Sequence, residues 1–120
     1  MSTTLNKSRL KAFNLQQRRC IYCELPMWLD HADAFAKKYK ITIKGAALFK
    51  CTAEHLLAKQ DGGKDAESNI VAACHFCNKK RHNCKKPKDP IAYKQYVSTR
   101  LCKGKWNSTF MIRSHMSSNM

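Results

Sequence analysis

The sequence has no long apolar run, no apolar leader and few acidic residues. No hydrophobic stretch approaches the roughly 18 residues that a membrane-spanning helix needs. Residues 1–10 include basic side chains but no apolar segment of the kind found in a secretory signal. We therefore expect a cytoplasmic protein that neither enters a membrane nor is secreted.

The chain also shows no internal repeat and no low-complexity linker, so its 120 residues predict one domain. Hydrophobic residues make up 43% and charged residues 26%, which is ordinary for a globular protein and argues against wholesale disorder. A domain of this size buries a small core, so a metal ion that joined distant segments would add much to its stability.

The shortage of acidic side chains leaves a large positive charge. Asp and Glu number 8 against 23 Lys and Arg, for a net charge of +15. Such self-repulsion is tolerated when the partner is a polyanion. Nucleic acid is the first expectation, because phosphate neutralisation releases counterions, and an anionic membrane surface is the weaker alternative.

Four of the seven cysteines form two CxxC pairs, Cys20 with Cys23 and Cys74 with Cys77. Two such pairs are typical of a tetrahedral structural zinc site, in which each tight turn supplies two thiolates. Buried free cysteines or a redox CxxC are the alternatives. The other three cysteines are expected to be small core or surface residues: Cys51, Cys84 and Cys102.

Local patterns predict helices that alternate with two short strands. The expected helices run from Ser8 to Arg19, from an Asp30 cap to Tyr39, from Cys77 to Cys84, and from Pro90 to Leu101 after an Asp89 cap. The expected strands span 47–57 and 70–73, on either side of a loop centred on Gly62 and Gly63. We expect a folded domain over 1–105 and a loosely ordered tail over 106–120.

A second constellation lies between the two cysteine pairs. Glu54 and His55 end the first strand, a Gly-Gly loop follows, Asn69 opens the second strand, and the Cys74 pair leads into Asn78 and a basic helix. This order resembles the HNH endonucleases of the ββα-metal type over about half of the chain. The resemblance implies an α+β fold with a ββα-metal core at about 47–84, flanking helices and a four-cysteine zinc site.

The resemblance also assigns roles to these side chains. His55 would be the general base, and imidazole accepts protons near neutral pH. Asn69 would bridge the loop and orient His55. Glu54, where the family more often has Asp or His, would be an oxygen ligand for a catalytic divalent ion. Neighbouring residues of a strand face opposite sides, so Glu54 and His55 can both face one cleft only if the pair lies at a strand end or a bend.

The sequence leaves the remaining ligands of the catalytic ion open. Asn78 and His82 are four residues apart and share a helix face. The family often has a metal-binding His at the position of Asn78, and Asn78, His82 or Asn83 can complete the site here. The expected ion is Mg²⁺, Mn²⁺ or Ni²⁺.

Basic side chains follow the second cysteine pair and are candidates for phosphate contacts. They position nucleic acid without reading its sequence, and no base-reading element is visible. The residues are Lys79, Lys80, Arg81, Lys85 and Lys86.

These features together predict a metal-dependent endonuclease that nicks DNA with low sequence specificity. The resemblance implies products with 5′-phosphate and 3′-hydroxyl ends. We expect a monomer, with a dimer as the alternative. Two other functions fit the charge and the cysteines: a zinc-dependent nucleic-acid-binding module without catalysis, and a zinc-stabilised protein–protein adaptor. The sequence leaves open whether the substrate is DNA or RNA. It also leaves open whether the role is in restriction, phage packaging, homing or repair.

Overall fold

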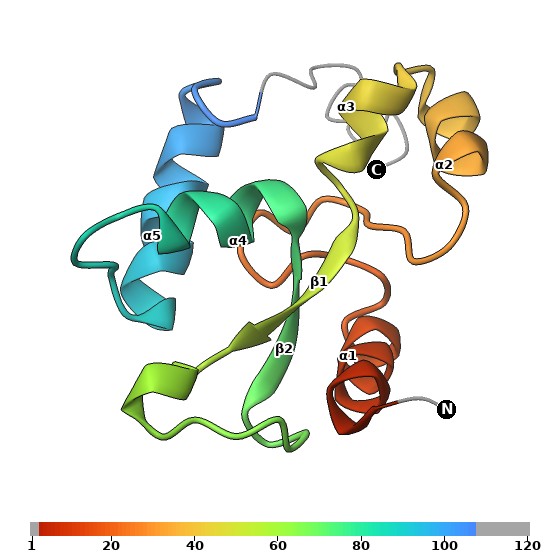
Figure 1. Ribbon diagram of the computed structural model, residues 1–120. Helices are drawn as coiled ribbons and strands as arrows, with labels where there is room; N and C mark the ends of the chain where they lie inside the picture. The colour runs from red at the N-terminus through yellow and green to blue at the C-terminus, as the bar shows by residue number, and fades with distance from the viewer. Residues whose placement is uncertain (1–2, 108–120) are drawn as a thin grey trace.

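The computed structural model describes residues 3–107 and places a two-stranded sheet at the centre of the molecule (Figure 1). Helix α1 lies on one side of the sheet, and α4 and α5 lie on the other. The predicted α+β class is confirmed. The elements are α1 (Thr4–Leu15), α2 (Ala32–Tyr39), α3 (Ile43–Ala47), β1 (Cys51–His55), the 3-10 turn η1 (Lys59–Asp61), β2 (Ile70–Cys74), α4 (His75–His82) and α5 (Pro90–Cys102).

Strands β1 and β2 are antiparallel, with Cys51 opposite Cys74 and His55 opposite Ile70. Helix α4 starts directly after β2, because Cys74 also caps that helix. Its sulfur accepts a hydrogen bond from the Cys77 amide at 3.4 Å. The two strands and α4 therefore form a continuous ββα unit.

The outer edge of β2 is closed by a side chain rather than by a third strand. The Gln16 amide nitrogen donates to the Ala72 carbonyl at 2.9 Å, and the Ala72 amide donates back to the Gln16 side-chain oxygen at 2.9 Å. The Ile21 amide donates to the same carbonyl at 3.0 Å. These bonds satisfy an exposed strand edge and fix the segment after α1 against the sheet.

Helix α1 ends earlier than Arg19, where the sequence placed its end. Gln17 and Arg18 have φ angles of 55° and 64°, so the chain leaves the right-handed helix at that point. The Arg18 amide closes the helix by donating to the Phe13 carbonyl at 2.8 Å. The helix also begins earlier, with Thr3 as its cap instead of Ser8.

The expected strand over 47–57 is too long at both ends, and its first part is helix. Thr42 caps α3 by accepting a hydrogen bond from the Gly45 amide at 2.9 Å, and the helix ends at Ala47. Only Cys51–His55 is strand. A local cap therefore determines the structure where apolar composition alone suggested strand. The Asp89 cap before Pro90 was predicted correctly, and its carboxylate accepts from the Ala92 amide at 2.9 Å.

Trp106 and Asn107, the first two residues of the expected tail, are both buried. The Trp106 indole nitrogen donates to the Cys77 sulfur at 3.3 Å, and its ring packs edge-on against Phe76 with centroids 5.3 Å apart. The chain after α5 therefore returns to cover the second cysteine pair. The rest of the predicted tail, 108–120, lies outside the described residues.

Within residues 3–107, no helix combines the length and the apolar composition that crossing a membrane requires.

The loop between the strands depends on the absence of a side chain at Gly63. A β-carbon there would lie 1.7 Å from the Leu57 carbonyl oxygen, so the backbone would have to move. We expect Gly63→Ala to lower the free energy of unfolding by about 1–3 kcal/mol, as overpacking does elsewhere. Urea unfolding measures this difference.

Gly62→Asn is the matched control in the same loop. Gly62 has φ of 93° and nothing within 4 Å of an added β-carbon, and asparagine tolerates left-handed backbone. Equal stability of Gly63→Ala and the parent protein would show that the loop accommodates the methyl group without cost.

Candidate metal and catalytic sites

Four cysteine side chains from two distant segments meet in the core. Their sulfur atoms all lie within 4.8 Å of one another and are buried, and the Cys23 and Cys74 sulfurs are 3.8 Å apart. A zinc tetrahedron with Zn–S bonds of about 2.3 Å has edges of about 3.8 Å. The cluster predicted from the two CxxC pairs therefore forms, with donors that suit zinc: Cys20, Cys23, Cys74 and Cys77.

Hydrogen bonds among the four thiols make their acidities unequal. Burial opposes ionisation of Cys20, but hydrogen bonds with the other three thiols outweigh it, and its pKa lies well below the ordinary value. Hydrogen bonds with Cys20 and its neighbours raise the pKa of Cys23 well above the ordinary value. By contrast, burial raises the pKa of Cys51 to about 12, which suits the small core residue expected there.

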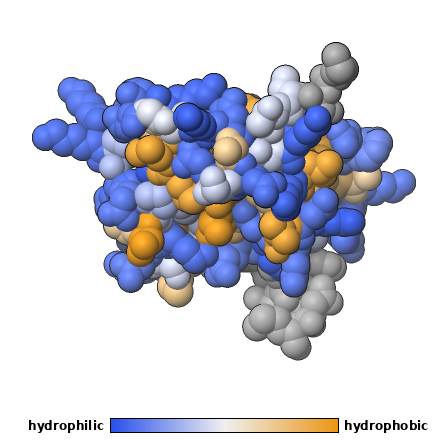
Figure 2. All heavy atoms as spheres, turned by 90° about the horizontal axis from the view of Figure 1, so that it is seen from below, coloured by the Kyte–Doolittle hydropathy of each residue, from blue (hydrophilic) through white to orange (hydrophobic). Residues whose placement is uncertain are grey.

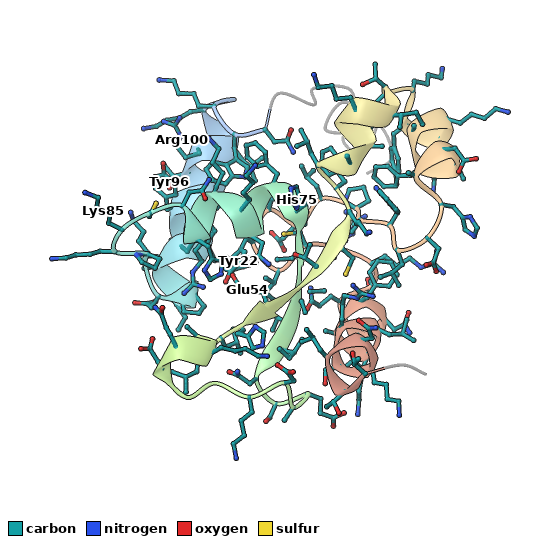
Figure 3. All side chains as sticks on the ribbon, viewed as in Figure 1. Tyr22, Glu54, His75, Lys85, Tyr96 and Arg100 are labelled. Atoms are coloured by element: carbon teal, nitrogen blue, oxygen red, sulfur yellow. The ribbon has the colours of Figure 1, made fainter. Side chains whose placement is uncertain are left out.

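Glu54 is the most deeply buried acidic side chain among the described residues, with 1% of its surface exposed. Tyr22 and Arg81 both donate to its oxygen Oε2, at 3.0 and 3.2 Å. The ring nitrogen Nε2 of His82 lies 2.8 Å from the other oxygen, Oε1. Figure 3 shows Tyr22 and Glu54 side by side between α4 and the sheet. Both oxygens of this buried carboxylate thus have a partner.

Tyr22 is a hydrogen-bond donor in this contact. Burial, followed by the charge of Glu54, raises the pKa of Tyr22 far above its ordinary range. Its hydroxyl therefore keeps its proton and directs it at Oε2. This contact was not anticipated, since nothing in a CxxC spacing shows where the intervening side chains point.

Arg81 is placed differently from its lysine neighbours. Its side chain is 8% exposed, and besides Glu54 it donates to the Lys88 carbonyl at 3.0 Å. The guanidinium is already engaged inside the protein. The phosphate contact predicted for Arg81 is therefore not supported by its position, which instead stabilises the buried charge of Glu54.

Asn78 and His82 both face β1 from α4. The Thr52 hydroxyl donates to the Ala73 carbonyl at 2.6 Å, so its oxygen accepts from the Asn78 amide nitrogen at 2.9 Å. That bond leaves the Asn78 amide oxygen as the atom available to a cation. Asn83 lies instead beside Phe76 and the α4 lysines, away from Glu54.

The atoms Glu54 Oε1 and His82 Nε2 suit a shared divalent ion. They are 2.8 Å apart, and Mg²⁺ binds ligands at about 2.0–2.1 Å, so one ion can reach both. Carboxylate, imidazole and amide donors fit Mg²⁺, Mn²⁺ or Ni²⁺ better than thiolate-preferring ions.

His55 is the last residue of β1, at the strand end where the sequence argument required it. Its nitrogen Nε2 lies 2.9 Å from Asp65 Oδ1, and Lys59 is 3.4 Å from the same oxygen. The hydrogen bond with His55, opposed by some desolvation and helped by Lys59, lowers the pKa of Asp65. Asp65 therefore stays ionised and fixes the imidazole.

Asp65 is a second contact that the sequence did not reveal. The loop over 60–68 contains Asp61, Asp65 and Glu67, and no spacing rule separates them. Only the folded loop brings Asp65 to His55, where the Ser8 hydroxyl also donates to the Asp65 carbonyl at 2.7 Å.

Asn69 bridges the loop between the strands. Its side-chain oxygen accepts from the Leu57 amide at 2.8 Å, and its nitrogen donates to the carbonyls of Leu57 and Lys64 at 3.0 and 2.9 Å. These bonds join the chain just after His55 to the chain just before Asp65. The arrangement supports the orienting role that the resemblance gave to Asn69.

The predicted lysine contacts lie on a different surface from Glu54. Lys79 and Lys80 are exposed on α4, where they line a hollow of about 340 Å³ with Phe76. Lys85 extends outward after α4 (Figure 3), and Lys86 is also exposed.

The face seen from below is mostly hydrophilic, with small separate apolar patches (Figure 2). A surface of this kind suits a charged partner better than an apolar one.

Asp65 makes the stability of the folded protein depend on pH in the acidic range. Because folding lowers its pKa below the ordinary 3.8, the contact with His55 stabilises the fold above that pH, and this stabilisation is lost as pH falls through the lowered value. We expect Asp65→Asn to be less stable than the parent at mildly acidic pH and the difference to shrink towards lower pH. Urea unfolding between about pH 2 and 6 measures it.

Asp61→Asn is the control, because Asp61 is an exposed acid in the same loop. A stability difference for Asp65→Asn that did not change with pH would show that its ionisation makes no contribution.

The cysteine cluster predicts about one zinc per chain and a fold that depends on it. Cys23→Ser removes a buried ligand, so we expect loss of both zinc and cooperative unfolding. Cys84→Ser, at an exposed cysteine outside the cluster, is expected to keep both. Elemental analysis and thermal unfolding on the same samples measure the two properties. Full zinc content in Cys23→Ser would contradict a four-cysteine site.

The family model described as HNH endonuclease matches residues 20–84. No curated protein and no solved structure matches the chain. The matched segment covers more than half of the sequence and runs from the first cysteine of the cluster to two residues beyond the end of the basic helix α4. The chain belongs to the HNH endonuclease family.

Proposed function

We propose that this protein is a metal-dependent endonuclease that hydrolyses DNA phosphodiester bonds. One observation carries the proposal. The carboxylate of Glu54 and the imidazole of His82 lie 2.8 Å apart beneath α4, and His55 stands at the end of the same strand as Glu54. Glu54, from the proposed cation-binding pair, and His55, the proposed base, are thus consecutive residues at the end of β1.

His55 acts as the general base through its free nitrogen. The ionised Asp65 accepts a hydrogen bond from the protonated Nε2, which leaves the lone pair of Nδ1 to take a proton from water. Asn69 holds both ends of the loop that carries Asp65. The imidazole is therefore fixed in tautomer and direction before substrate arrives.

Glu54 and His82, with the amide oxygen of Asn78, would hold one divalent ion, Mg²⁺, Mn²⁺ or Ni²⁺. When bound, that ion supplies positive charge for the scissile phosphate and the departing 3′ oxygen. Zinc in the cysteine cluster would have a structural role only, since four thiolates leave no open position for substrate. The expected products are 5′-phosphate and 3′-hydroxyl ends.

The exposed lysines would hold the DNA backbone. Phosphate contacts position a duplex without reading bases, so we expect low sequence specificity. One catalytic site in a monomer cuts one strand per encounter, and a double-strand break would need two nicks or a dimer. The proposed contacts are Lys79, Lys80, Lys85 and Lys86.

A zinc-dependent nucleic-acid-binding module without catalysis is the second candidate. Glu54 already has Tyr22, Arg81 and His82 as partners, a set that also suits a purely structural carboxylate. Cleavage in the presence of divalent metal separates the two functions.

The first experiment is nicking of supercoiled plasmid with Mg²⁺, Mn²⁺ or Ni²⁺ and with EDTA. We expect His55→Ala to lower the cleavage rate by roughly 10²–10⁴, the usual contribution of a general base. Its zinc content and its affinity for DNA should be unchanged.

His75→Ala is the matched control, because His75 is exposed at the start of α4 (Figure 3) and outside the proposed site. If the zinc-loaded protein binds DNA but does not cleave it with Mg²⁺, Mn²⁺ or Ni²⁺, the result would favour the binding module. Cleavage by His55→Ala at the parental rate would remove His55 from the mechanism.

A further inference from the structure

The contact between Tyr22 and Glu54 joins two sites that are separate in the sequence. Tyr22 lies in the turn between Cys20 and Cys23, and its hydroxyl is 3.0 Å from Glu54 Oε2. A residue between two zinc ligands has no necessary contact with a neighbouring site. Here it reaches the carboxylate assigned to the catalytic ion.

The Tyr22 ring has little freedom to move. It is buried, its amide donates to the Cys20 sulfur at 3.3 Å, and its ring packs edge-on against Tyr93 with centroids 4.8 Å apart. The Tyr93 hydroxyl donates to the Cys77 carbonyl at 2.7 Å and not to Tyr22 or Glu54. The first cysteine turn and the ring of Tyr93, which a phenylalanine would also supply, thus fix the position of the Tyr22 hydroxyl.

The two oxygens of Glu54 have different surroundings. Tyr22 and Arg81 both donate to Oε2, from the first cysteine turn and from α4. His82, a candidate ligand, is the partner of Oε1. A carboxylate held in this way offers Oε1 to a cation and keeps Oε2 occupied.

We propose that Tyr22 is a positioning residue that couples the four-cysteine cluster to the catalytic metal site, by holding Glu54 Oε2 so that Oε1 is the oxygen that binds the divalent ion. The proposal rests on the proposed function only in taking Glu54 as a ligand of that ion.

Loss of the hydroxyl would free one side of the carboxylate. Outer partners of metal ligands orient them, and their removal typically weakens metal binding about 10–100-fold. The effect is on affinity for the divalent ion, because Tyr22 touches neither His55 nor Asp65.

The test compares Tyr22→Phe with Tyr93→Phe. Each variant loses one buried tyrosine hydroxyl beside the cysteine cluster, but only the first loses a bond to Glu54. Mn²⁺ affinity is measured by titration of zinc-loaded protein, followed by the paramagnetic signal of free Mn²⁺. Zinc content is measured on the same samples, and Glu54→Gln identifies which Mn²⁺ ion belongs to this site.

We expect Tyr22→Phe to bind Mn²⁺ about 10–100-fold more weakly than the parent, and Tyr93→Phe to bind it within about threefold of the parent. Both should hold about one zinc per chain. A high Mn²⁺ concentration should restore nicking by Tyr22→Phe but not by His55→Ala, since only the latter lacks the base.

Unchanged Mn²⁺ affinity in Tyr22→Phe would overturn the proposal, as would equal weakening in the two tyrosine variants. Loss of zinc from Tyr22→Phe alone would also overturn it, because the hydroxyl would then serve the cluster and not Glu54. A parent protein that binds no Mn²⁺ would refute both this proposal and the proposed function. A parent that binds Mn²⁺ through Glu54 but never nicks DNA would refute the function alone.

Discussion

The buried carboxylate of Glu54 constrains the arrangement of the elements around it. An ionised group removed from water is costly unless charges and hydrogen-bond donors replace the solvent. Tyr22, Arg81 and His82 provide them, from the turn after α1 and from two successive residues near the end of α4. Helix α4 therefore cannot slide along the sheet without exposing or unpairing this charge. The ββα unit is fixed in register by one polar contact set as well as by its apolar packing.

The cysteine cluster secures the same region from the other side. Cys23 and Cys74 are 51 residues apart in sequence, and their sulfurs are 3.8 Å apart in space. A metal ion bound by both cysteine pairs would close a long loop and restrict the unfolded chain strongly, which matters in a domain with a small core. Trp106 covers the cluster, so the chain after α5 is also anchored at this point.

The sequence predicted the features that depend on spacing and one of the helix caps, Asp89, but not the caps of α1 and α2. The two CxxC pairs, the order of Glu54, His55 and Asn69, and the Asp89 cap before Pro90 all have short-range signatures. The start of β1 was misplaced because apolar residues before Cys51 suit either helix or strand, and the Thr42 cap decides between them. The contacts of Tyr22 and Asp65 were invisible, because each depends on where a distant segment lies after folding.

The end of β1 brings the two proposed roles of the candidate site together while giving each its own partners. Glu54 lies beneath α4, and His55, the last residue of the strand, meets the loop that follows it. The metal side consists of buried partners held by the core. The base side consists of a half-buried His55–Asp65 pair whose loop is closed by Asn69 and anchored to α1 through Ser8. A change in the loop would therefore reach the proposed base through Asp65. A change in α4 would reach the proposed metal ligands through the contacts of Glu54.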